Sequence, residues 1–143
     1  MAKHHSRFAL SIRGLVLSGA FLYSGCDKSR TNDDSPAGSY TATSLITTTN
    51  GQATDHVANG SSVAIVLAPD GTTSGEVHIK PIAGTPALDA DLTGTWTSKG
   101  RDVDLDHWAD TFLRDLPLTF NAGTLVGDRI FDRSRLQLTL SRR

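Results

Sequence analysis

The sequence has a single cysteine, Cys26, among its 143 residues, so no disulfide can form within the chain. It also lacks a long hydrophobic run. The longest stretch that is apolar or only weakly polar, 14–23, covers ten residues, whereas roughly 20 are needed to span a bilayer. The 14 basic residues do not outnumber the 15 acidic ones and form no stripe, which argues against a nucleic-acid partner. Helical periodicity is nearly absent, which argues against a helical domain.

The first 25 residues have the organisation of a secretory signal peptide. Three basic residues precede the apolar stretch 14–23, and two small residues, Ser24 and Gly25, follow it. A basic head, a short apolar middle and small residues at the boundary are the three parts of such a signal. We therefore expect the protein to be exported and residues 1–25 to be removed.

Cys26 follows the two small residues directly, and the composition turns polar after it. In this arrangement the stretch resembles bacterial lipoprotein signals, although leucine usually occupies the position of Tyr23. The resemblance implies that Cys26 is lipidated with acyl chains such as palmitate, and several chains make an anchor stable. We expect the outer membrane, with the domain facing the periplasm or the cell surface, although Asp27 after the cysteine retains some lipoproteins at the inner membrane. An ordinary signal peptide cut elsewhere and an uncleaved anchor remain alternatives.

Residues 26–38 are expected to form a flexible tether between the lipidated cysteine and the domain. The segment has no apolar periodicity and no aromatic residue, so it cannot bury enough surface to offset the entropy of ordering it. All 15 acidic residues follow Cys26, whereas three of the 14 basic ones precede it. The mature protein is therefore net acidic.

Residues 39–143 alternate between apolar and polar side chains with turn residues between the runs, which predicts about eight short strands in one all-β domain. The expected strands are 40–47, 62–68, 76–80, 92–97, 103–105, 116–120, 124–131 and 136–141. Short consecutive connections favour a short antiparallel up-and-down barrel over a sandwich, because closure removes unpaired edges. Such a barrel would be filled by side chains or hold only a small ligand.

Three details of this domain stay open or depend on strict alternation. In the first strand, alternation places Tyr40, Ala42, Ser44 and Ile46 on one face. The segment 49–61 is interpreted as a short extra strand or a long loop. The segment 107–114 has aromatic residues at helical spacing, which allows one helical turn before Pro117.

Three short motifs resemble the small lipocalin-like barrels of bacterial lipoproteins. They are Gly38-Ser-Tyr40, Gly94-Thr-Trp96 and the segment 123–128 before the last strand. The resemblance covers nearly all of residues 38–143 and implies a calycin-type barrel. The segment 92–97 is also similar to the opening strand of avidins, but it sits too late in the chain for biotin binding to be carried over.

Four large aromatic residues, Tyr40, Trp96, Phe120 and Phe131, are the candidates for lining a ligand pocket or for filling the core. Asp102, Asp104 and Asp106 are weak calcium candidates, since calcium loops begin with oxygen ligands at alternate positions. The residues at which an EF-hand would need glycine and glutamate are His107 and Leu113, so a strand with an acidic outer face is the simpler interpretation.

No other pattern of metal ligands or catalytic residues stands out. The mature histidines, His56, His78 and His107, are far apart in the sequence, and His78 between Glu76 and Lys80 fits an exposed strand position. A Ser-His-Asp triad would have to assemble in space, and the segment 71–75 does not match a nucleophile elbow. We therefore expect no cofactor and no catalytic site.

The sequence thus favours a monomeric, lipid-anchored envelope protein whose non-enzymatic barrel binds a small apolar or amphipathic molecule. A structural module of the envelope, or one that binds a protein partner through its acidic outer face, is the alternative. A hydrolase is the third.

Overall fold

The computed structural model describes residues 34–82 and 86–143. The predicted signal peptide, Cys26 and most of the predicted tether lie outside the described residues. The strands are β1 (Gly38–Thr49), β2 (Gln52–Asp55), β3 (Ser62–Leu67), β4 (Thr72–Ile79), β5 (Leu88–Asp91), β6 (Gly94–Lys99), β7 (Asp102–His107), β8 (Leu118–Asn121), β9 (Thr124–Phe131) and β10 (Ser134–Arg142). One short helix, α1 (Phe112–Asp115), lies between β7 and β8.

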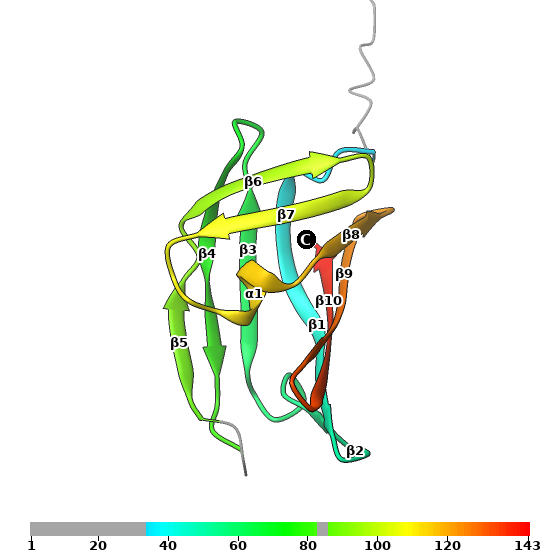
Figure 1. Ribbon diagram of the computed structural model, residues 1–143. Helices are drawn as coiled ribbons and strands as arrows, with labels where there is room; N and C mark the ends of the chain where they lie inside the picture. The colour runs from blue at the N-terminus through cyan, green and yellow to red at the C-terminus, as the bar shows by residue number, and fades with distance from the viewer. Residues whose placement is uncertain (1–33, 83–85) are drawn as a thin grey trace, which may run out of the picture.

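Eight of the strands close into an antiparallel barrel, as the sequence predicts (Figure 1). The order around the barrel is β1-β3-β4-β6-β7-β8-β9-β10, and the pairing of β10 with β1 closes the ring. The remaining two strands are short additions: β2 pairs with the second half of β1, and β5 pairs with the second half of β4. The segment 49–61 therefore contains both a short strand and a loop.

The first strand departs from strict alternation at Thr43. Ala42 pairs with Leu140 and Ser44 pairs with Thr139, so Thr43 is an extra residue in β1, a β-bulge. A bulge shifts every later side chain to the opposite face. The prediction that Ser44 and Ile46 share a face with Tyr40 is therefore wrong. Leu45 is buried inside the barrel instead, with only 2% of its surface exposed.

Turn residues lie between the strands, as the sequence predicts, and the helical segment lies within the predicted region. Asn50 and Gly51 both have positive φ, 51° and 79°, which suits a two-residue hairpin turn between β1 and β2. The predicted helical turn is α1, although it begins at Phe112 and does not include Trp108. Leu116 at its end is extended, as expected for a residue that precedes proline.

The interior is apolar along most of its length, and its two ends differ. The chain enters the barrel at Gly38, and we call this end, with Arg142 and the 121–123 turn, the entry end. The opposite end, which contains the β1–β2 and β9–β10 turns, is called the cavity end (Figure 1). Buried leucine, isoleucine and valine side chains from every strand of the ring except β6 fill the space between the two ends.

The entry end is closed by one arginine. The Arg142 guanidinium lies over two aromatic rings, with its Cζ 5.6 Å from the centre of Tyr40 and 5.3 Å from that of Phe120. It also donates hydrogen bonds to the carbonyls of Ser35 and Ala37 and to the Tyr40 hydroxyl. The last residues of the predicted tether are therefore held against the barrel.

Candidate functional site

The cavity end contains a partly open cavity of about 230 Å³ at the mouth of the barrel. Its lining is almost entirely apolar and comes from four strands, α1 and the connections next to β2 and β5: Leu45, Thr47, His56, Ile79, Pro86, Ala87, Leu88, Phe112 and Leu136. Mostly apolar lining with few polar groups is typical of small-molecule sites. The volume is below that of most drug-sized sites, so only a small molecule fits.

Local structure in β1 and in the loop after β2 places the polar part of this lining. The bulge at Thr43 turns Leu45 and Thr47 inward. The backbone N–H of His56 donates to the Leu45 carbonyl at 2.8 Å, and the Ser61 N–H donates to the His56 carbonyl at 2.9 Å. The Asp55 carboxylate accepts hydrogen bonds from the backbone N–H groups of Val57 and Ala58, which fixes the turn of this loop.

His56 and Thr47 form the only polar pair among the described residues of the cavity lining. The His56 Nε2 and the Thr47 Oγ1 share a hydrogen bond of 2.8 Å, and the imidazole is 1% exposed. The Nδ1 of His56 is buried with no hydrogen-bond partner among the described residues. Burial lowers the pKa of His56 below its ordinary value, and the nearby Asp55 charge raises it by less. The imidazole is therefore neutral at pH 7, and the lining carries no charge.

The helix α1 borders one side of the cavity with Phe112. A second buried histidine, His107, holds the start of this helix in place. The His107 Nε2 shares a hydrogen bond of 2.6 Å with the Oγ1 of Thr111, the residue before α1. Leu113 is fully buried in the core, and Phe112 borders the cavity. Burial, and then the charge of Arg114, lower the pKa of His107, while Asp106 and Asp115 raise it. This hydrogen bond and the burial of Leu113 fix the position of Phe112.

The four aromatic residues singled out from the sequence lie elsewhere. Tyr40 and Phe120 belong to the buried core at the entry end. Trp96 is half-buried beside the β3–β4 turn, where its Nε1 donates to the Ala68 carbonyl at 2.8 Å. Phe131 is half-buried on β9, with the Arg129 Cζ 5.0 Å from its ring centre. None of the four lines the cavity.

Sequence reasoning missed the residues that do line the cavity. The inward orientation of Leu45 and Thr47 follows from the bulge in β1. No residue in the sequence indicates that bulge. His56, Leu88 and Phe112 come from three separate segments and meet only through the closure of the barrel.

Asp102, Asp104 and Asp106 lie on the exposed outer face of β7. Across residues 34–82 and 86–143, no three histidine, cysteine, aspartate or glutamate side chains come together in a way that could hold a metal ion. His78 lies exposed on β4 and pairs with Asp89 of β5. In the same part of the chain, no helix has both the length and the apolar character needed to cross a membrane.

The fold is that of a small, closed antiparallel barrel with eight strands in its ring, and it is compatible with a calycin-like barrel. Comparison of the chain with family models, with curated proteins and with solved structures gives no match. The fold and the geometry of the sites are therefore the basis of the functional proposal.

Proposed function

We propose that this protein is a lipid-anchored protein of the cell envelope whose non-enzymatic barrel binds a small apolar or amphipathic molecule at the cavity end. The supporting observation is the cavity of about 230 Å³ that Leu45, Ile79, Leu88, Phe112 and Leu136 line together with one neutral polar pair. Burying apolar surface stabilises binding by roughly 25 cal/mol per Å². A short alkyl chain in this cavity would gain from that effect without facing a charge.

The polar pair indicates which polar group the proposed ligand carries. The Thr47 hydroxyl and the His56 imidazole are the polar groups of the lining. Because no lysine or arginine is among the described residues that line the cavity, a carboxylate would lose its hydration without gaining a partner of opposite charge. A neutral alcohol or amide with a short alkyl chain suits the site better than a fatty acid of the same length.

The test is ligand-dependent stabilisation of the full chain in lipid nanodiscs. A molecule that binds only the folded state raises the melting temperature. We expect 1-octanol to raise it and octanoate at pH 8 to raise it less. Thr47→Phe fills the cavity and should abolish the effect of octanol. Thr48→Phe adds the same bulk on the outer face of β1 and should leave the effect of octanol intact. Because both variants are measured in the same nanodiscs, their comparison also corrects for octanol that dissolves in the lipid.

Two results would contradict the cavity proposal. One is an equal response of Thr47→Phe and Thr48→Phe to octanol, and the other is no response of the unmodified chain. A protein that instead co-purifies with another envelope protein, with its cavity empty, would support the alternative of a partner-binding module.

The proposed membrane anchor needs a separate experiment. Cys26 lies outside the described residues, so its lipidation is supported by the sequence alone. Intact-mass analysis of membrane-extracted protein should give a chain that begins at Cys26 and carries acyl chains. The Cys26→Ser variant should leave the membrane fraction. An unmodified thiol would contradict the anchor and leave the proposal for the cavity untouched.

A further inference from the structure

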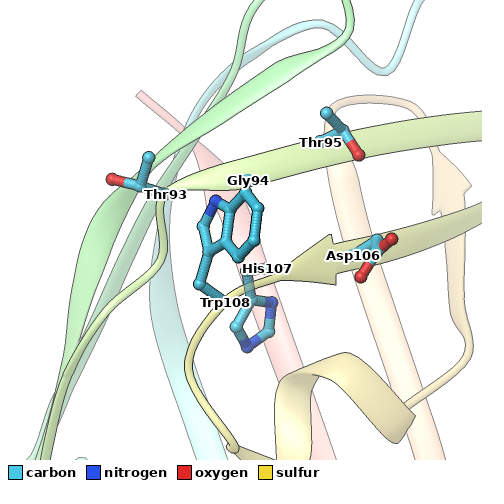
Figure 2. Close-up of a pocket in the computed structure, with 6 residues that line it drawn as sticks. All are labelled: Thr93, Gly94, Thr95, Asp106, His107 and Trp108. Atoms are coloured by element: carbon cyan, nitrogen blue, oxygen red, sulfur yellow. The ribbon is translucent and has the colours of Figure 1, made fainter.

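Trp108 is the most exposed large apolar residue of the described chain. It follows the last residue of β7, and 90% of its surface is accessible to solvent. Figure 2 shows its indole beside Thr93 and Gly94 at the start of β6. The indole borders a shallow pocket of about 200 Å³ on the outer face of the barrel, called the outer pocket here, lined by Thr93, Gly94, Thr95, Asp106, His107 and Trp108.

The backbone on both sides of Trp108 is fixed. Gly94 pairs with His107, and a Cβ at Gly94 would lie 2.2 Å from the Asp106 carbonyl oxygen, so only glycine lets β6 and β7 approach this closely. The Trp108 N–H donates to the Thr93 carbonyl at 3.3 Å. The backbone that carries the indole is therefore held in place, so that binding has to order only the side-chain torsions of Trp108.

Two exposed polar side chains, those of Thr95 and Asp106, line the outer pocket beside the indole. Thr95 of β6 pairs directly with Asp106 of β7, and both side chains point outward. Neither side chain makes a hydrogen bond with any other described residue. The next outward pair along the hairpin, Thr97 and Asp104, repeats the same combination. Hydroxyls donate and accept hydrogen bonds and carboxylates accept them, so the hairpin presents a row of both types beside an exposed indole.

This combination matches the surface of a sugar. A hexopyranose ring has one flat face of C–H groups, which stacks on an aromatic ring, and a rim of hydroxyls, which donate to carboxylates and exchange hydrogen bonds with threonine. An anionic lipid surface fits poorly, since Asp102, Asp104 and Asp106 share this face and would repel it. An apolar peptide would leave the Thr and Asp groups desolvated and unpaired.

We propose that the outer pocket is a saccharide-binding site that takes one hexopyranose unit of a neutral linear glycan. Trp108 stacks on the ring, and Asp106 and Thr95 bind its hydroxyls. The Thr97–Asp104 pair lies where the next unit of the glycan would continue along the hairpin. This site is on the outer face of the barrel and does not depend on the ligand proposed for the interior cavity.

Calorimetric titration of the full chain in lipid nanodiscs with cellotetraose, chitotetraose and maltotetraose tests the proposal. We expect at least one of the three to bind. Trp108→Ala should weaken that binding by about tenfold or more, because a tryptophan at the centre of a site carries much of the affinity. Asp106→Ala should weaken it as well, and Trp108→Phe, which keeps an aromatic face, should retain part of it.

Ile130→Ala provides the matched control, because Ile130 is 69% exposed on β9 and does not line the outer pocket. It should leave sugar binding unchanged, and the exposed position of Trp108 means that its variants should stay folded. The proposal is overturned if none of the three tetrasaccharides binds, or if Trp108→Ala binds as well as the unmodified chain. It is also overturned if a tetralysine peptide binds through Trp108 and the sugars do not, since the site would then recognise cations.

Discussion

The two ends of the barrel differ both in the elements that form them and in the size of the side chains that they contain. At the entry end, β1 contributes Tyr40, β8 contributes Phe120, and Arg142 covers both rings. At the cavity end, the inward residues of β1 are Leu45 and Thr47, and a cavity of about 230 Å³ remains. No residue of β6, β7 or β8 lines the cavity, whereas β5 and α1 contribute Leu88 and Phe112. The elements that reach an end and the volume of their inward side chains together decide whether that end of this barrel is filled or hollow.

The largest expected effect compares one leucine of the filled interior with its neighbour at the cavity. Leu138 is 1% exposed, so Leu138→Ala opens a new cavity in close packing and should lower the free energy of unfolding by about 2–5 kcal/mol. Leu136, two residues earlier on the same face of β10, borders space that is already empty. Leu136→Ala should therefore cost distinctly less.

Urea melts of both leucine variants measure this difference. His78→Ala is a suitable baseline because His78 is exposed on β4, and it should change the free energy of unfolding by no more than about 0.5 kcal/mol. Equal losses for Leu136→Ala and Leu138→Ala would mean that the cavity end is as well packed as the rest of the interior.

The next effect concerns the cover of the entry end. Arg142→Ala removes three hydrogen bonds and two cation–π contacts and should lower the free energy of unfolding by about 1–3 kcal/mol. It should also release residues 35–37, which hydrogen exchange would detect as faster exchange of the Ala37 amide. Arg143→Ala is the control, since Arg143 is exposed. If Arg142→Ala is as stable as the Arg143→Ala control, the Arg142 guanidinium does not close this end.

The smallest effect is a dependence on pH that is confined to the cavity end. Burial lowers the pKa values of His56 and His107 in the folded protein below the ordinary value of 6.5. As the pH falls below 6.5, the unfolded chain binds more protons at these residues than the folded chain does, so stability present at neutral pH is lost. Acid should therefore destabilise the cavity end, namely the loop after β2 and the helix α1. The entry end around Tyr40 and Arg142 should be destabilised only at lower pH.

Amide exchange at pH 7 and pH 5 measures this effect. Residues 56–61 should lose protection at the lower pH, while residues 39–42 keep theirs. His56→Gln can retain the hydrogen bond to Thr47 but cannot take up a proton, so it should reduce the loss around residues 56–61. An unchanged loss in His56→Gln would assign the pH dependence to another group.

The sequence allowed the strands and the barrel to be predicted, but neither the Arg142 cover of the entry end nor the lining of the cavity end. Alternation and turn residues are local signals, so the strands and the overall barrel could be predicted from them. The bulge at Thr43 carries no such signal, because threonine is equally suited to a regular strand. The cavity depends on that bulge and on three segments that meet only in the closed barrel. The outer pocket shows the same limit, since a strand pattern places Asp106 outward but does not reveal the exposed indole beside it.

The pairing of β1 with β10 also has a consequence for how the domain folds. Tyr40 and Arg142 are 102 residues apart in the chain, and their strands make the contact that closes the ring. Contacts between distant residues form slowly, because a long loop must first be closed. Until residues 134–142 join the sheet, one edge of β1 has free N–H and C=O groups that could pair with another chain. An incompletely folded chain is therefore most exposed to aggregation at its first strand, and closure waits for the last one.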